Sequence, residues 1–160
     1  MSQSMITTAT SVRQIGLQQI PLIPEELLDV QSPAFSNTLR WNIGHIVFCF
    51  QHFLSIGLPY QSDLPASYAT LFQTGTKPSD WTTASPSKDE LIHYLSVQLE
   101  RLSSVTPDEL EAALPAPITM GPFQFTTVGE VFNFAVMHES IHLGIISSMV
   151  KVVAQEAATK

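Results

Sequence analysis

A long helical pattern near the carboxyl end of the sequence constrains the fold more than any other feature. It begins with Thr-Val-Gly-Glu at residues 127–130, where the spacing of Thr127 and Glu130 matches a capping box. Apolar side chains and two histidines then recur every three or four residues, at Val131, Phe134, His138, His142, Ile145, Met149 and Val152. This period predicts a helix over residues 127–154 with that stripe buried. Such a stripe must pack against other elements, which calls for further helices.

The remaining pattern supplies those helices. It predicts a helix over residues 4–19 that ends before Pro21 and Pro24, and a second that starts at Ser36 or Asn37 and stops at Gly57. A third begins at Ser87, with a stripe of leucines at Leu91, Leu95, Leu99 and Leu102. Short helices are expected at residues 24–30, 66–72 and 107–117, and strand signals are weak. The predicted class is therefore all-α, one domain over residues 1–160. Its architecture is an up-and-down four-helix bundle with a long crossover, residues 58–86, between helices 2 and 3.

Charge excludes some classes of partner. The formal net charge is −7, and the seven basic residues are scattered along the chain. No basic patch is available for nucleic acid or for an anionic membrane surface. The single cysteine, Cys49, excludes an intramolecular disulfide, and we find neither a signal-peptide pattern nor an apolar run long enough to span a bilayer. These observations predict a cytoplasmic protein.

Three histidines form the main candidate site. His138 and His142 are four residues apart on a predicted helix, which places both imidazoles on one face. His45 lies on the stripe of the second helix, which comprises Trp41, His45, Phe48, Cys49 and His52. Buried imidazoles need partners, and one divalent metal ion would satisfy all three. The alternative is that they are core histidines bonded to backbone or water. Three nitrogens leave coordination positions open, as in catalytic sites, and suit zinc, nickel, iron or cobalt.

Other residues carry weaker hypotheses. His138-Glu139-Ser140-Ile141-His142 matches the H-E-x-x-H pattern of zinc proteases, in which the glutamate is the general base. Such proteases generally take a third ligand downstream, where this chain offers only Glu156, so we discount that interpretation. Glu139 is turned about 100° from His138 and is expected on the surface or behind the ligands. His52 is expected in the core or in a pocket wall, and both it and Glu139 are candidate catalytic bases.

Two further residues are assigned no chemistry. His93 falls off the leucine stripe and is expected to be exposed to solvent. Cys49, four residues after His45, is interpreted as a small buried hydrophobe rather than as a nucleophile.

Four segments of the sequence resemble the DinB-like superfamily. They are PEELLDVQSPAFSNTLRWNIGHI, LFQTGTKPSDW, PSKDEL and HESIHLGII, within a match over about residues 10–155. The resemblance implies a bundle with a long crossover between its second and third helices, His45, His138 and His142 as metal ligands, and a frequent dimeric state. It also implies relatives that are thiol-dependent S-transferases using bacillithiol or mycothiol, or a maleylpyruvate isomerase. The chain departs from the family where it has Gln51 and His52, and again at Ile145.

Three functional hypotheses follow. The first is a metal-dependent S-transferase whose small-molecule substrate is a low-molecular-weight thiol that attacks an electrophile. The second is a metal-dependent hydrolase using bound water, with Glu139 or His52 as base. The third is a metal-binding stress-response protein without turnover. An open cleft at the histidines would favour chemistry, whereas a closed, packed site would favour a structural role.

Overall fold

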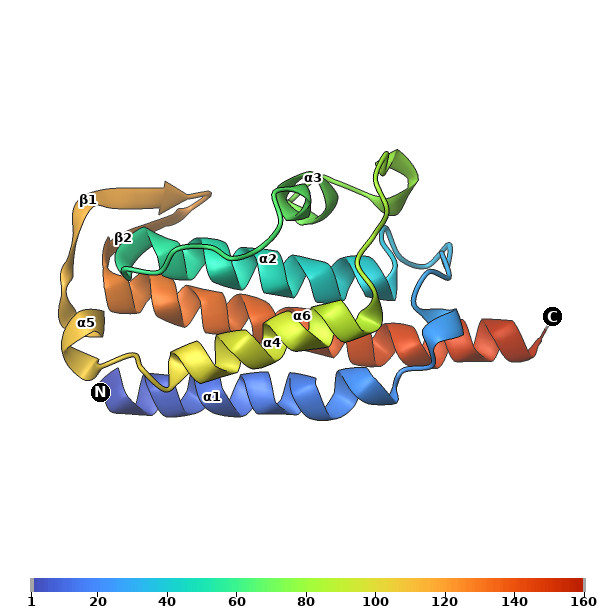
Figure 1. The fold of residues 1–160 in the computed structure, drawn as a ribbon, viewed down its shortest axis with the longest axis horizontal. Coiled ribbons are helices and arrows are strands. Elements are labelled where there is room, and N and C mark those ends of the chain that lie inside the picture. The colour runs from blue at the N-terminus through green and yellow to red at the C-terminus, as the bar shows by residue number, and fades with distance from the viewer. Residues whose placement is uncertain (1, 160) are drawn as a thin grey trace.

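Four long helices lie side by side in the computed structural model, which describes residues 2–159 (Figure 1). They are α1 (Ser2–Gln19), α2 (Leu39–Gly57), α4 (Lys88–Leu102) and α6 (Val128–Ala158). Helix α2 packs against α6 and α4, and α1 packs against α4 and α6. The longest helix, α6, therefore has a neighbour along two of its sides.

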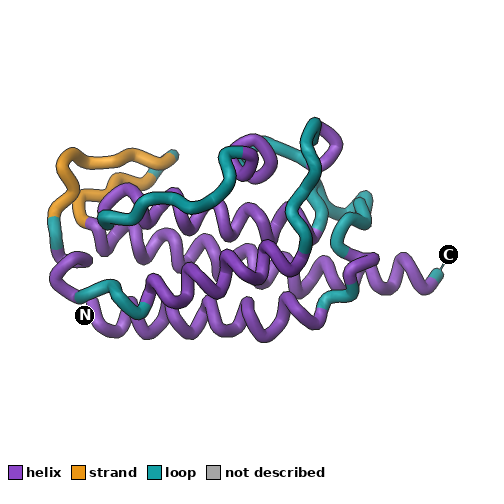
Figure 2. The backbone as a smooth tube through the Cα atoms, in the orientation of Figure 1, coloured by secondary structure: helices purple, strands orange, loops and turns teal. Residues whose placement is uncertain are grey.

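Short elements fill the connections between these helices (Figure 2). Two 3₁₀ turns, η1 (Ile20–Leu22) and η2 (Glu25–Leu27), follow α1, and the crossover contains α3 (Ser67–Phe72) and the 3₁₀ turn η3 (Pro78–Asp80). Helix α5 (Pro107–Glu111) precedes the strands β1 (Ala113–Met120) and β2 (Phe123–Thr127). The short helix predicted at residues 66–72 is thus confirmed, and it lies on the outside of α2.

The helix starts are set largely by capping side chains. Ser87 accepts a hydrogen bond from the backbone N–H of Glu90, and Thr127 and Glu130 form the predicted capping box. The second helix differs from expectation, because its N-cap is Thr38 rather than Ser36 or Asn37. Thr38 accepts from the N–H of Trp41, which fixes the start of the helix that carries His45.

The all-α prediction is wrong for residues 113–127, where β1 and β2 form an antiparallel hairpin. The short helix expected over residues 107–117 ends at Glu111, and Pro115 and Pro117 lie within β1. Proline is tolerated there because β1 has a partner on one edge only, and the register is irregular between Ala113 and Ile118. Gly121 closes the two-residue turn with a φ of 57°, a conformation that favours glycine.

The buried face of α6 also differs from the predicted stripe. The fully buried side is formed by Phe132, Val136, Glu139, Leu143 and Ile146. The predicted stripe is only partly right, since Val131 and Met149 are buried whereas Phe134, His138, His142 and Ile145 are half-buried. The buried face was not recognised in the sequence because it includes Glu139. An ionisable side chain is rarely buried without a partner, so a glutamate normally indicates an exposed face.

The apolar core consists of two clusters, and Val12 and Phe48 pack against both. One contains Trp41 and Met149, and the other contains Cys49, Phe53 and Val136. On α2, His45 lies between Trp41 of the first cluster and Cys49 of the second. Within residues 2–159, we find no helix with the length and apolarity needed to cross a membrane.

Candidate metal centre

His45 on α2 and His138 and His142 on α6 converge on one point. One ring nitrogen from each lies within 4.8 Å of the others. The Nε2 atoms of His45 and His138 are 3.2 Å apart, and the three ring centroids are separated by 4.6 to 5.0 Å. His45 is 3% exposed, whereas the two histidines of α6 are half-buried. The three residues predicted from spacing are thus brought together by the packing of α2 on α6.

Hydrogen bonds fix the orientation of two of these rings. His45 Nδ1 lies 2.6 Å from the carbonyl oxygen of Phe72, and His142 Nδ1 lies 2.9 Å from Oδ1 of Asn42. Both partners only accept, so each Nδ1 carries the hydrogen and each Nε2 keeps its lone pair. The amide of Asn42 donates to the carbonyl of Thr38, which holds its oxygen towards His142. Such partners behind a histidine are typical of metal ligands.

Neutral rings are favoured at all three positions. Burial lowers the pKa of His45 below its usual value, although the Phe72 carbonyl opposes this. Burial, and then repulsion from His45, lowers the pKa of His138 to about 4. Burial, followed by repulsion from His138 and His45, lowers the pKa of His142 to about 3. A cation other than a proton is therefore the better partner for these nitrogens at neutral pH.

The donor set fits a divalent transition metal. Two Nε2 lone pairs are fixed by hydrogen bonds on the far side of their rings, and the third, on His138, faces one of them at 3.2 Å. Neutral imidazole nitrogens suit zinc, nickel or iron rather than calcium or magnesium, which prefer oxygen. His45, His138 and His142 are the residues that would hold the ion.

We expect metal affinity to change little between pH 8 and pH 5 and to fall steeply near pH 4. A proton competes with the ion only near the pKa of the folded ligand, and that of His138 is about 4. Titration calorimetry with zinc over this range measures the effect. A loss of affinity centred on pH 6.5, the value for an unperturbed histidine, would contradict it.

Gly44, next to His45 in the sequence, allows helix α3 to pack closely against α2. A Cβ atom at Gly44 would overlap the ring of Phe72, whose carbonyl accepts from His45. The Phe72 ring can approach α2 only because residue 44 has no side chain. Helix α3 therefore contributes directly to the orientation of a ligand, which explains a glycine in the middle of a buried helix.

We predict that Gly44→Ala weakens zinc binding by about 10- to 100-fold, since Phe72 must move away from His45. This should occur although alanine is the better helix former by about 1 kcal/mol. The matched control is Gly144→Ala on α6, where an added Cβ would meet no atom within 4 Å. Competition with a chromogenic chelator measures both variants. Equal affinity of Gly44→Ala and wild type would refute the positioning role of Phe72.

His138 opens onto a pocket of about 590 Å³, here called the site pocket. Its walls come from α2, α6, the segment after α3 and the hairpin, and comprise Phe48, Cys49, His52, Phe53, Gln73, Thr74, Met120, Phe134 and His138. Four of these are large apolar side chains, and His138 is the ligand that faces the cavity. A smaller pocket of about 330 Å³ reaches His142 beside Trp41 and Asn42. An open site of this kind favours chemistry over a structural ion.

The other candidate residues lie outside the histidine cluster, in three different environments. Glu139 is not on the surface, because it is 2% exposed and its Oε2 pairs with Arg13 at 2.9 Å. His52 was expected either in the core or in a pocket wall. It is exposed and lines the site pocket, so the second alternative is confirmed. His93 is exposed, as predicted.

Cys49 is buried, and its sulfur lies 3.6 and 3.5 Å from Nδ1 and Nε2 of His45. Burial raises the pKa of this thiol to about 12, so it remains protonated at neutral pH. That agrees with the interpretation of Cys49 as a small hydrophobe. Trp41 stacks on the same imidazole, with centroids 4.4 Å apart and planes inclined by 15°.

Sequence reasoning missed the two partners of the ligands. Asn42 gave a usable signal, because it is an amide in a strongly apolar helix and lies three residues before His45. Phe72 gave none, since its contribution to His45 is a backbone carbonyl that any residue could supply.

Comparison with known proteins agrees with this geometry. The sequence model of the DinB superfamily matches residues 13–146, a span that includes all three histidines and the crossover. A search of curated proteins gives no match. The chain is therefore a member of the DinB superfamily.

Proposed function

We propose that this protein is a metal-dependent S-transferase that joins a low-molecular-weight thiol to a small apolar electrophile. One observation carries the proposal: the three-histidine cluster reaches, through His138, a pocket with four large apolar side chains in its wall and, within residues 2–159, no carboxylate in its lining. Attack by a thiolate needs no carboxylate base, whereas activation of water commonly uses one. The proposal also takes α1, α2, α4 and α6 as the helices of an up-and-down bundle, which their pairwise contacts support.

The pocket walls favour an apolar electrophile. Phe53 and Phe134 stand edge to face with centroids 5.3 Å apart, and Phe134 also contacts the hairpin through Phe125. Met120, at the tip of β1, completes this side of the pocket. Aromatic and thioether surfaces bind flat apolar groups and exclude water from them.

The chemistry divides between the ion and the chain. When bound by the three histidines, a divalent metal lowers the pKa of a thiol that it coordinates. The sulfur lone pair forms the new carbon–sulfur bond, and the leaving group departs with the electron pair of the bond that breaks. The thiol proton passes to solvent or to the imidazole of His52, the exposed histidine in the pocket wall.

The hydrolase alternative is less well supported. Its best candidate base, Glu139, is paired with Arg13 and faces the core rather than the site pocket. His52 is the remaining base within the pocket wall, and it serves the transferase equally well.

The test uses zinc-loaded protein, cysteine, bacillithiol or mycothiol as the thiol, and 1-chloro-2,4-dinitrobenzene as the electrophile. We expect a thioether and one equivalent of chloride with at least one thiol, and with His138→Ala only the rate measured without protein. His52→Ala should lower kcat by on the order of 10²-fold if its imidazole takes the proton. No thioether from any thiol would defeat the proposal. Ester cleavage without thiol would instead support the hydrolase.

A further inference from the structure

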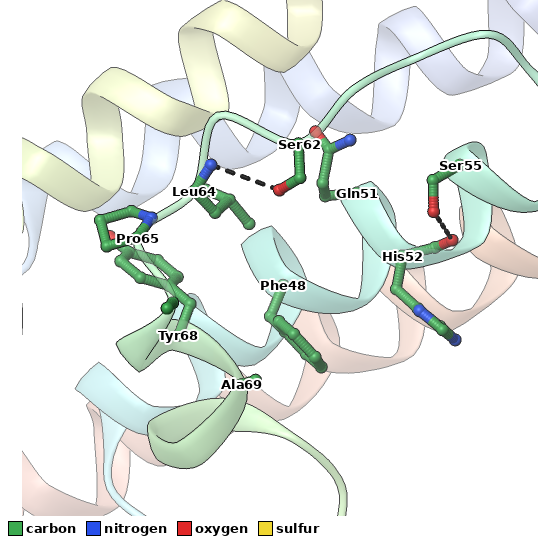
Figure 3. A pocket seen from close by; sticks show the side chains of 10 residues that line it. Phe48, Gln51, His52, Ser55, Ser62, Leu64, Pro65, Tyr68 and Ala69 are labelled. Atoms are coloured by element: carbon green, nitrogen blue, oxygen red, sulfur yellow. Dashed lines mark hydrogen bonds between the residues drawn. The ribbon is translucent and has the colours of Figure 1, made fainter.

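A second cavity, here called the α3 pocket, lies between α2 and the crossover. Its wall is mainly apolar and includes Leu64, Pro65, Tyr68 and Ala69 (Figure 3). Within residues 2–159, its lining contains no aspartate, glutamate, lysine or arginine side chain. Its volume of about 220 Å³ equals that of about seven molecules of liquid water. A cavity of this size and polarity has room for several methylene groups of a ligand.

Two side chains of α2 separate the α3 pocket from the site pocket. Phe48 and His52 line both cavities, and Figure 3 shows them projecting from the same side of α2. They are four residues apart, so they form one ridge along the helix. Cys49 and Phe53, each one residue further on, line the site pocket and not the α3 pocket, whereas Gln51 lines the α3 pocket and not the site pocket. The two cavities therefore lie on opposite sides of this ridge.

The ring of Phe48 is held in place by its neighbours. It is half-buried and packs against both clusters of the core. The imidazole of His52 is nearly parallel to it, with ring centroids 6.3 Å apart and planes inclined by 9°. Aromatic rings at such a separation attract each other in an offset stack. Because His52 is exposed to solvent, Phe48 is the better fixed part of the partition between the two cavities.

We infer that Phe48 determines the size of the substrate, because its ring ends the site pocket on the side of α3. A flat apolar group fits among Phe53, Phe134 and Met120, and a chain attached to it has room until it meets the Phe48 ring. Longer chains must stay in solvent, although the α3 pocket behind the ring is apolar and large enough to hold them. That the ligand is an electrophile rests on the proposed function, whereas the limit on its apolar length does not.

A series of alkylbenzenes, from toluene to hexylbenzene, measures this limit in zinc-loaded protein. These compounds carry neither a leaving group nor a ligand for the metal, so they report binding alone. The ¹³C-methyl signal of Met120, in the wall of the site pocket, follows the titration. Each methylene that leaves water should tighten binding about fourfold, and in wild type this gain should stop at an intermediate chain length. A gain that continues to hexylbenzene, or no saturable shift with any compound, would overturn the inference.

Truncation of Phe48 should join the two cavities. In Phe48→Ala the gain should continue for at least about two more methylenes, so the ratio of hexylbenzene to toluene affinity should rise by about 10-fold or more. Phe48→Leu, which loses less packing, should raise the same ratio by a smaller factor. The matched control, Phe134→Ala, removes a ring that lines the site pocket but not the α3 pocket, so it should weaken all compounds without raising the ratio. An unchanged ratio in both Phe48 variants, or an equal rise in Phe134→Ala, would overturn the role of Phe48.

Refilling the α3 pocket makes the second measurement. Ala69→Leu enlarges a side chain that lines the α3 pocket but not the site pocket, so by itself it should leave every affinity as in wild type. Combined with Phe48→Ala, it should abolish the gain with the longer chains. A gain that survives Ala69→Leu would mean that these chains lie elsewhere, and it would overturn the inference. If the alkylbenzenes behave as expected but no thiol forms a thioether, the length limit stands and the S-transferase proposal fails.

Discussion

Glu139→Leu is expected to lower the free energy of unfolding by about 3–5 kcal/mol. The substitution removes the carboxylate that pairs with Arg13 at 2.9 Å, and both side chains are almost fully buried, at 0% and 2% exposed. Arg13 also donates to Gln98 at 2.8 Å and lies 4.3 Å from the centre of the Phe50 ring. These neutral contacts cannot replace the lost counter-charge, so the variant keeps an uncompensated cation in the core. Urea denaturation of wild type and variant measures the difference.

The double variant Arg13→Met with Glu139→Leu should recover most of this loss, because it leaves no buried charge. It also removes two buried atoms, Arg13 Nε and Glu139 Oε1, that have no hydrogen-bond partner within the described residues. Lys77→Met, which breaks an exposed pair with Asp80, should change stability by about 0.5 kcal/mol or less. Additive effects in the double variant would contradict coupling between the two residues. We expect the double variant to bind zinc like wild type, since neither residue contacts the three histidines through any hydrogen bond in the structure.

The sequence predicts those parts of this protein that depend on local spacing. His138 and His142 share a face because four residues make about one helical turn, whatever else the chain does. Ser87 and Thr127 cap their helices by bonding to backbone three residues later, and the structure has both caps. His45 could be added because it lies in the middle of the second helix, on a stripe that is mainly apolar.

Contacts between residues that are distant in the sequence could not be predicted in this way. The partner of Glu139 is Arg13, 126 residues away, and without that partner a glutamate indicates an exposed face. The predicted stripe on α6 is only partly right for the same reason. The hairpin was missed because Pro115 and Pro117 argue against a strand, and they are compatible with β1 only because its other edge is unpaired.

The other large effect is expected at the metal centre. Wild type should bind one divalent ion per chain, and His142→Ala should bind at least about 100-fold more weakly, beyond the 10- to 100-fold typical of residues behind a ligand. Loss of one imidazole leaves the Nε2 atoms of His45 and His138, 3.2 Å apart, as the remaining pair. Elemental analysis after dialysis and chelator competition measure content and affinity.

A graded series makes this prediction specific to the geometry. Asn42→Leu keeps all three ligands but removes the oxygen that fixes the His142 ring at 2.9 Å, so its affinity should lie between wild type and His142→Ala. His93→Ala removes an exposed imidazole far from α6 in the sequence and should bind zinc like wild type. Since burial holds the pKa of His142 near 3, the alanine variant should fold at neutral pH with no loss of a charged group. Equal metal content in wild type and His142→Ala would mean that these histidines do not bind the ion. An Asn42→Leu variant as tight as wild type would mean that His142 is oriented by packing against Trp41, whose ring centroid lies 6.4 Å away, rather than by the amide.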